Sequence, residues 1–375
     1  MKSKTTYFGV LFILLSMLTG CGGGGGGATA SRSTSTDGPI TFTTAGASFA
    51  PVLTVDPGAT VTWTWSDGTT SNSATPAKSF GSAASRTQTL TVTPWSALKG
   101  INVGYDAADD GDPGIPHVPA QDVTAIDGLA VAAPYLETFC ASYSRITSLN
   151  FDNFINLKTI EVYKGVLSTL TLKNTPALTR LNVEENDLAG LDISGSPNLA
   201  DIRASLNLFP TITWGTGSKL WHICVRDNAQ MTNRDMFVDL TGWPVLQHLW
   251  IWNTNQTGTL KTTSDTLTSV RAHRNSYTSA DFTGAFIGTY GTGELLIYDN
   301  RLTSLVLAGC PALVYVDAHN NQLSAAAIDT IVQTLDSLGA QNGTLNLLQN
   351  APPSATGRQH IENLRGKGWS VQVEG

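Results

Sequence analysis

The chain has 375 residues, of which 41% are hydrophobic and 14% are charged, and its formal net charge is −7 at pH 7. This acidic balance repels phosphate backbones and argues against nucleic-acid binding. Four cysteines without a short spacing argue against a disulfide framework or a zinc knuckle, so the fold must rest on packing.

Residues 1–21 predict export and lipid anchoring. Lys2 and Lys4 precede an apolar stretch that is too short to span a bilayer and is typical of a signal peptide. The stretch "LTGC" at 18–21 resembles the lipobox of bacterial lipoproteins. The resemblance implies cleavage before Cys21 and lipidation of that residue. The alternative is an ordinary signal peptide with a chance cysteine.

Residues 22–38 are rich in Gly, Ser and Thr and predict a flexible tether between the membrane and the folded part. Gly22 stands where an aspartate commonly retains lipoproteins at the inner membrane. The resemblance to lipoproteins therefore implies a location in the cell envelope, with the outer membrane favoured. Whether the protein faces the periplasm or the cell surface stays open.

Residues 39–94 predict a small β-sandwich. The runs "TVTWTW" (60–65) and "TQTLTVTP" (87–94) alternate apolar and polar residues, which is typical of half-buried strands, and turn signals separate them. The stretch "VTWTWSDGT" resembles polycystic-kidney-disease-type (PKD-like) immunoglobulin folds. That resemblance implies a spacer, with a direct ligand-binding role as the alternative.

Residues 136–350 contain a recurring pattern, L-x-x-L-x-L-x-x-N, in registers mostly 21 residues apart. The registers begin at Leu136, Leu157, Leu178, Leu199, Leu220, Leu246, Leu267, Thr292 and Leu313. Six ninth positions are asparagine: Asn186, Asn207, Asn228, Asn275, Asn300 and Asn321. The pattern resembles the leucine-rich repeats of bacterial, internalin-like surface proteins. Each repeat would be one strand-containing rung of a solenoid.

Segments on both sides of the repeats predict its ends. Within residues 95–135, "LKGINVGYD" (98–106) fits the first half of a repeat and predicts an N-terminal cap and first rung. Helices are expected near 325–338 and 355–365, and residues 351–375 resemble the C-terminal cap of the same family. The fold class is therefore mainly β with some α: a solenoid of about nine to eleven parallel rungs with a helical cap, preceded by the sandwich.

Positions three, five and seven of each register should point away from the core and line the face that this family makes concave. They hold four of the six histidines of the chain. Exposed aromatic side chains grouped with arginine are typical of binding surfaces. The candidate ligand-binding residues are His222, Arg226, His248, Trp250, Trp252, Arg271, His273, Tyr298, Tyr315 and His319. Lateral packing between parallel strands is the alternative explanation.

A protein ligand is the first candidate for this face, because internalin-like relatives use it for protein partners, and a polysaccharide is the second. The membrane is contacted only through the lipid, and a monomer is expected. A passive structural spacer of the envelope is the alternative function.

A metal-dependent enzyme is a remote third possibility. Asp201, His222 and His248 occupy one column, but a row of ligands does not converge on a point as chelation requires. The carboxylates of "DAADDGD" (106–112) lack the spacing of a calcium loop. Cys140 and Cys224 fall too far apart in the repeat to pair, and Cys310 is expected to be a small buried residue. No catalytic motif is present, and no cofactor, metal or catalytic residue is predicted.

Overall fold

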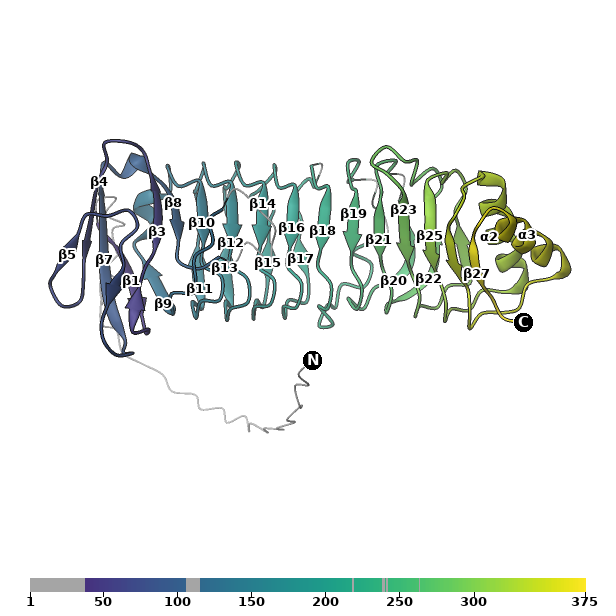
Figure 1. Ribbon diagram of the computed structural model, residues 1–375, viewed down its shortest axis with the longest axis horizontal. Helices are drawn as coiled ribbons and strands as arrows, with labels where there is room; N and C mark the ends of the chain where they lie inside the picture. The colour runs from purple at the N-terminus through teal and green to yellow at the C-terminus, as the bar shows by residue number, and fades with distance from the viewer. Residues whose placement is uncertain (1–37, 106–114, 218, 238–239, 241, 263) are drawn as a thin grey trace, which may run out of the picture. The chain divides into compact units, whose positions relative to one another are not determined.

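One long parallel sheet organises the chain (Figure 1). The computed structural model describes residues 38–105, 115–217, 219–237, 240, 242–262 and 264–375. Twelve neighbouring strands of this sheet run parallel, in chain order. They are β8 (Leu98–Asn102), β10 (Thr138–Cys140), β12 (Thr159–Glu161), β14 (Arg180–Asn182), β16 (Asp201–Arg203), β18 (His222–Cys224), β19 (His248–Trp250), β21 (Ser269–Arg271), β23 (Gly293–Leu296), β25 (Leu313–Asp317), β26 (Thr344–Asn346) and β27 (Ser370–Gln372).

The pairing of these strands confirms the predicted registers. The third position of every register lies beside the third position of the next, in an unbroken column from β10 to β25. The column is Thr138, Thr159, Arg180, Asp201, His222, His248, Ser269, Glu294 and Tyr315. The longer steps before Leu246 and Thr292 are therefore accommodated in the loops, and the strands stay in register.

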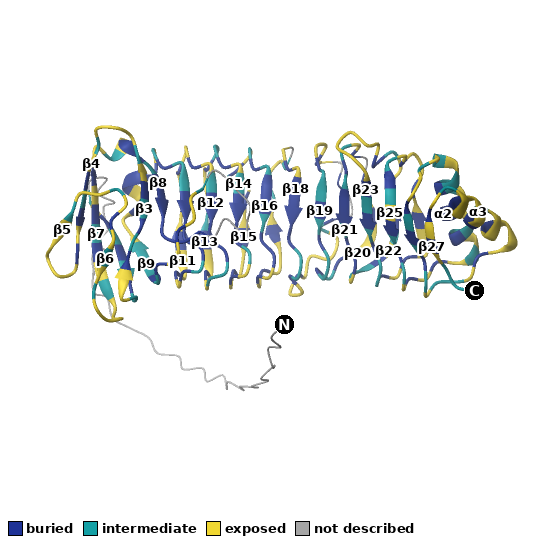
Figure 2. Ribbon diagram, in the orientation of Figure 1, coloured by how far each residue is buried: buried dark blue, intermediate teal, exposed yellow. Residues whose placement is uncertain are grey.

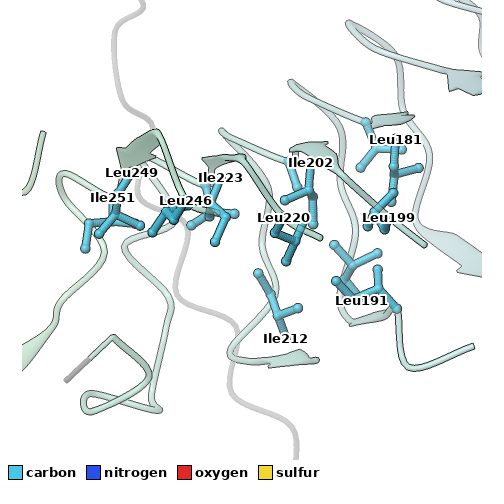
Figure 3. Close-up of a cluster of buried hydrophobic side chains, with 14 of the residues drawn as sticks. Leu181, Leu191, Leu199, Ile202, Ile212, Leu220, Ile223, Leu246, Leu249 and Ile251 are labelled. Atoms are coloured by element: carbon cyan, nitrogen blue, oxygen red, sulfur yellow. The ribbon is translucent and has the colours of Figure 1, made fainter. Parts of the chain in front are cut away.

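The aliphatic positions of the repeat form one continuous core. Ile202, Ile223 and Leu249 hold the same register position in successive strands and are fully buried (Figure 3). Leu191 and Ile212 reach the same core from the returning side of their turns. Each buried aliphatic side chain contributes roughly 2 kcal/mol, and neighbouring turns share the interior that they fill.

The returning side of the solenoid carries shorter sheets. They pair β11 (Ser148–Asn150) with β13 (Thr169–Thr171), β15 (Leu191–Asp192) with β17 (Ile212–Thr213), and β22 (Ser276–Asp281) with β20 (Thr257–Lys261) and β24 (Ser304–Val306). The fold is mainly β, and the β-solenoid has about eight turns. This number is below the nine to eleven rungs predicted from the sequence.

A ladder of buried asparagines ends the strands of the repeat. Asn207 donates from Nδ2 to the carbonyls of Val183, Ala204 and Ser205 at 2.9, 3.2 and 3.1 Å. Its Oδ1 accepts from the backbone N–H of Leu188 at 3.1 Å. All six predicted asparagines make this set of bonds, and each joins its own turn to the preceding one.

The residue before each of these positions takes a left-handed backbone conformation. Ten successive turns have φ between 50 and 58° there, at Tyr143, Lys164, Glu185, Leu206, Asp227, Asn253, Arg274, Asp299, Asn320 and Gln349. The same tight turn therefore follows each strand from β10 to β26, and where an asparagine comes next it brings the amide to the carbonyl groups that it satisfies.

The N-terminal region is antiparallel. A five-stranded sheet has the order β5 (Thr70–Ser71), β4 (Thr60–Thr64), β7 (Arg86–Thr93), β1 (Ile40–Thr44) and β9 (Val123–Asp127), and β2 (Ser48–Phe49) pairs with β6 (Lys78–Ser79). Phe42, Phe49, Trp63 and Trp65 pack together as its buried aromatic core.

This region extends beyond the predicted boundary at residue 94. β9 comes after the first strand of the solenoid and still pairs with β1, and β3 (Val52–Val55) pairs antiparallel with β8. Two short 3₁₀ helices, η1 (Trp95–Ala97) and η2 (Leu129–Ala132), also lie in the segment predicted as cap and first rung. The strands of the first region therefore continue directly into the long sheet.

The two predicted C-terminal helices are present as α2 (Ala325–Leu338) and α3 (Ala355–Gly366). α2 connects β25 to β26, α3 connects β26 to β27, and the two helices pack against each other. Ile328, Ile331 and Leu335 of α2 are buried, while the outer sides of both helices are exposed (Figure 2).

Three predicted features lie outside the described residues: the signal peptide with Cys21, the tether up to residue 37, and the carboxylate-rich loop at 106–112. Within the part of the chain that the structure describes, no helix is long and apolar enough to cross a membrane.

We expect Asn207→Ala to lower the free energy of unfolding by about 2–4 kcal/mol, because it leaves several buried backbone groups without partners. Urea unfolding followed by circular dichroism measures this. Asn156→Ala is the matched control, since exposed Asn156 makes one bond, to the carbonyl of Pro134, and should cost less than about 1 kcal/mol. Equal losses in the two variants would contradict a structural role for the ladder.

Candidate functional site

The candidate site is the strand face, defined here as the side chains at positions three, five and seven of the registers. Alternation along β19 explains why it exists: Leu249 and Ile251 are buried in the core, and His248, Trp250 and Trp252 point to the other side. All ten candidate residues lie on this face, between the turn of β18 and the turn of β25.

Five of them form a stacked column at the seventh positions. Arg226 lies over the ring of Trp252 with Cζ 5.1 Å from the centroid. The Trp252 and His273 rings follow at 5.2 Å, His273 and Tyr298 at 4.3 Å, and Tyr298 and His319 at 4.6 Å, all within 14° of parallel. These separations are close to the spacing of the strands that carry the rings, so one ring per turn produces a continuous stack.

The stack places His273 in a dry position. Its side chain lies between the rings of Trp252 and Tyr298, the residue is only 7% exposed, and its Nδ1 has no hydrogen-bond partner. Burial, followed by the positive charge of Arg274, lowers the pKa of His273 to about 4. The imidazole is therefore neutral at pH 7 and contributes a flat ring to the stack.

A second group, the indole–histidine cluster, surrounds Trp250. The ring of His222 meets it edge-on at 5.0 Å, His248 lies at 6.1 Å, and Arg271 lies over it with Cζ 4.8 Å from the centroid. The indole Nε1 donates to Ser269 Oγ at 3.0 Å. These contacts hold the indole in place, and the side chain is half-buried.

Hydrogen bonds continue from this cluster to the next strand. Ser269 Oγ donates to Glu294 Oε1 at 2.8 Å, and Arg271 Nε donates to the same oxygen at 2.7 Å. Burial would raise the pKa of Glu294, but the hydrogen bonds from Arg271 and Ser269 outweigh it and hold that pKa below its ordinary value. Glu294 is therefore a carboxylate at neutral pH.

A buried ionic network supports the cluster from the side of β16. Asp201 lies 2.7 Å from His222 Nδ1 and within 3.4 Å of the guanidinium groups of Arg180 and Arg203, and Arg180 Nε also contacts Glu161 at 2.6 Å. Burial would raise the pKa of Asp201, but the hydrogen bond and charge of His222 and the two arginines lower it overall. This network fixes the orientation of the His222 ring.

The column of Asp201, His222 and His248 does not converge as a chelate. His222 already uses Nδ1 on Asp201, and its ring lies perpendicular to that of His248 with centroids 5.7 Å apart. In the described residues, no group of three or more His, Cys, Asp or Glu side chains is arranged to hold a metal ion.

Two candidate residues are less accessible than their position in the repeat suggests. His222 is 5% exposed and His273 is 7% exposed, whereas both were expected to be open to a ligand. The reason is lateral: a flat ring on a parallel strand is covered by the side chains of the strands on either side. Trp250 and Trp252 are half-buried for the same reason.

Cys140, Cys224 and Cys310 are buried. Burial raises the pKa of the Cys224 thiol and of the Cys310 thiol to about 12 in each case. Both are therefore protonated thiols at neutral pH, and Cys310 is the small buried residue that the sequence predicts.

Sequence reasoning missed Trp221. It occupies the second position of its register, directly before β18, and is 36% exposed. Its ring lies 5.5 Å from that of His222 and 5.7 Å from that of His248, so it extends the indole–histidine cluster. The candidate residues came only from positions three, five and seven, so the second position was not considered, although second positions such as Lys158 and Thr179 are exposed as well.

On the first strands of the long sheet, the strand face is covered by other residues of the chain. Tyr105, Cys140 and Tyr163 form a separate buried cluster, against which Ile115 packs. Asn102 Nδ2 donates to the carbonyl of Pro116 at 3.1 Å and holds this returning segment. The accessible aromatic side chains of the face therefore belong to the later strands.

Comparisons with known proteins give structural similarity only. No protein-family model matches the chain, and no curated protein matches it. The functional domain of InlJ from Listeria monocytogenes, which includes a cysteine ladder, has a TM-score of 0.40 at 21% identity, covering 68% of this chain and 52% of that one. The chain thus spans about half of that domain.

Two further structures show a similar degree of likeness. An internalin, inlF, from Listeria monocytogenes has a TM-score of 0.39 at 13% identity, covering 81% of this chain and 86% of that one. YopM from Yersinia enterocolitica has a TM-score of 0.37 at 24% identity, covering 59% of this chain and 49% of that one.

The stacked column predicts a pH dependence of stability. The pKa of His273 is about 4 in the folded chain and 6.5 in the ordinary state, so the unfolded chain binds the proton first. The contribution of neutral His273 to the free energy of unfolding is complete above pH 6.5. It is lost as the pH falls towards 4, which lowers the free energy of unfolding by on the order of 2–3 kcal/mol. Urea unfolding from pH 7.5 to 4 measures it. His273→Phe should flatten the profile in this window, and identical profiles for the two proteins would contradict the assignment.

Proposed function

We propose that this protein is a lipid-anchored protein of the cell envelope that binds a macromolecular ligand through its strand face. A protein ligand and a glycan ligand are both compatible with this proposal. The observation that supports it is the exposure of two aromatic side chains: Trp221 is 36% exposed and Tyr315 is 40% exposed.

Lateral packing explains the stacked column but not these two side chains. Rings inside the column use both faces on their neighbours, which stabilises the strands whether or not a ligand binds. Trp221 and Tyr315 leave aromatic surface open to water instead. Aromatic side chains that leave part of their surface open to water are typical of binding surfaces, and a passive spacer has no use for them.

The support for lipid anchoring comes from the sequence alone. The basic residues, the apolar stretch and "LTGC" at 18–21 favour a lipoprotein signal, and the glycine-rich segment that follows favours a tether. We propose the outer membrane as the location, since Gly22 replaces the residue that commonly retains lipoproteins at the inner membrane.

We expect the double variant Trp250→Ala/Trp252→Ala to reduce ligand capture at least about tenfold. Its fold should persist because both indoles lie outside the aliphatic core, although lost stacking should lower the free energy of unfolding by about 1–3 kcal/mol. The measurement is affinity capture of envelope proteins and polysaccharides by the detergent-solubilised full chain, quantified against the unsubstituted protein.

Tyr290→Ala is the control for this experiment, because Tyr290 is exposed but precedes the strand of its turn. It should capture as the unsubstituted protein does. Equal capture by the double variant would contradict binding at the strand face. The absence of any saturable ligand for the unsubstituted protein would favour the passive spacer.

Cys21→Ala should abolish lipidation and move the protein from the membrane fraction to the soluble fraction. Metabolic labelling with a fatty-acid analogue, followed by cell fractionation, measures both effects. Cys310→Ala removes a buried cysteine and should leave the labelling unchanged. Lipid label retained by Cys21→Ala would contradict the anchoring proposal.

A further inference from the structure

A row of five side chains runs from Trp221, at the border of the strand face, to Tyr315, and we infer that it binds a neutral glycan chain in extended form. The glycan row consists of Trp221, which directly precedes β18, and the third positions of β19, β21, β23 and β25, which are His248, Ser269, Glu294 and Tyr315. The inference rests on the proposed function of this face and names the class of its ligand.

Both ends of the glycan row are aromatic and open. Trp221 is 36% exposed, and its ring is held in place by His222 and His248 at 5.5 and 5.7 Å. Tyr315 is 40% exposed at the opposite end. Aromatic rings that present free surface pack well against the apolar C–H groups of a sugar ring, and their polar atoms stay in contact with water.

The middle of the glycan row is polar and less exposed than its two ends. Ser269 is a small, buried side chain, and the neighbouring Glu294 is half-buried. The hydrogen bonds from Ser269 and Arg271 both end on Oε1 of Glu294, and Oε2 has no bonding partner among the described residues. That second carboxylate oxygen is therefore available to accept from the hydroxyl group of a ligand.

The charges of the surrounding face are already neutralised in pairs. Arg271 contacts Glu294 at 2.7 Å, and Arg226 contacts Asp227 at 3.0 Å. An anionic polymer would have to displace these carboxylates to reach the guanidinium groups, which are also covered by the indoles of Trp250 and Trp252. A neutral ligand rich in hydroxyl groups meets no such cost, because charged pairs can still accept and donate hydrogen bonds.

The spacing of the strands matches a linear polymer. Four steps between neighbouring strands separate Trp221 from Tyr315, a span of about 19 Å at roughly 4.8 Å per step. One sugar unit of an extended glycan advances by about one such step. The geometry therefore favours a ligand of four to five linked sugars, with the aromatic side chains at its two ends and hydrogen bonds between them.

The test uses isothermal titration calorimetry on the detergent-solubilised full chain. The probes are soluble oligomers of glucose, xylose, galactose and N-acetylglucosamine, from the single sugar to the hexamer, with a sulfated polysaccharide for comparison. We expect one series of neutral oligomers to bind. Its affinity should rise with chain length up to about four or five sugar units and then stay constant.

Four variants locate the binding. Trp221→Ala and Tyr315→Ala should each weaken the affinity about tenfold, a change that corresponds to the loss of one stacking contact. Trp221→Phe keeps a ring and should stay within about threefold of the unsubstituted protein. Ile155→Ala removes an exposed apolar side chain beside an earlier strand and should change nothing. Circular dichroism establishes that each variant is folded.

Three results would overturn the inference. One is tighter binding of the sulfated polysaccharide than of every neutral glycan. Another is neutral-glycan binding that Trp221→Ala and Tyr315→Ala leave unchanged. The third is no glycan binding at all while a protein ligand is captured through Trp250 and Trp252, in which case the proposed function survives and the ligand class is wrong.

Discussion

The shared aliphatic core is the constraint on which the rest of this structure depends. A single turn buries too few aliphatic side chains to offset the conformational entropy lost when its residues become ordered. Stacked turns overcome this because the side chains of each, such as Ile202, Ile223 and Leu249, fill an interior that the next turn also lines. The asparagine ladder works at the same place, since each amide satisfies carbonyl groups of its own turn and of the preceding one.

The same stacking of turns determines how the side chains of the strand face pack. Parallel strands place equivalent positions about 4.8 Å apart, which is near the separation at which flat rings stack. Trp252, His273 and Tyr298 therefore become a column, and their faces are used by one another. What remains for a ligand is the surface that this packing leaves open, at Trp221 and Tyr315, and the polar groups between them. Rigid, preorganised side chains of this kind lose little entropy when they bind.

Much of this architecture was predictable because it repeats. The period of the leucines predicted the strand registers and the places of the six asparagines, and local patterns located both terminal helices. The pairing of β9 with β1 was not predictable, since strands about 80 residues apart leave no local signal of their contact.

At the candidate site, too, the features that could not be predicted depend on contacts between strands. Periodicity predicted which side of the sheet His222 and His273 occupy, but their burial depends on the neighbouring strands that cover them. Trp221 was missed because it holds the second position, which precedes the strand and lies outside the three positions considered. The period of the sequence therefore predicts whether a side chain faces the core. Its solvent exposure depends on the side chains of the neighbouring strands.

Hydroxyl-radical footprinting read by mass spectrometry is the most direct measurement of this arrangement, because it reports the solvent exposure of individual side chains in the folded protein. The account predicts rapid oxidation of Trp221 and Tyr315, slower oxidation of Trp250, and protection of Leu249 and Ile251 until the chain unfolds. Protected Trp221 together with readily oxidised Leu249 and Ile251 would mean that the two sides of the sheet are exchanged, and would contradict it.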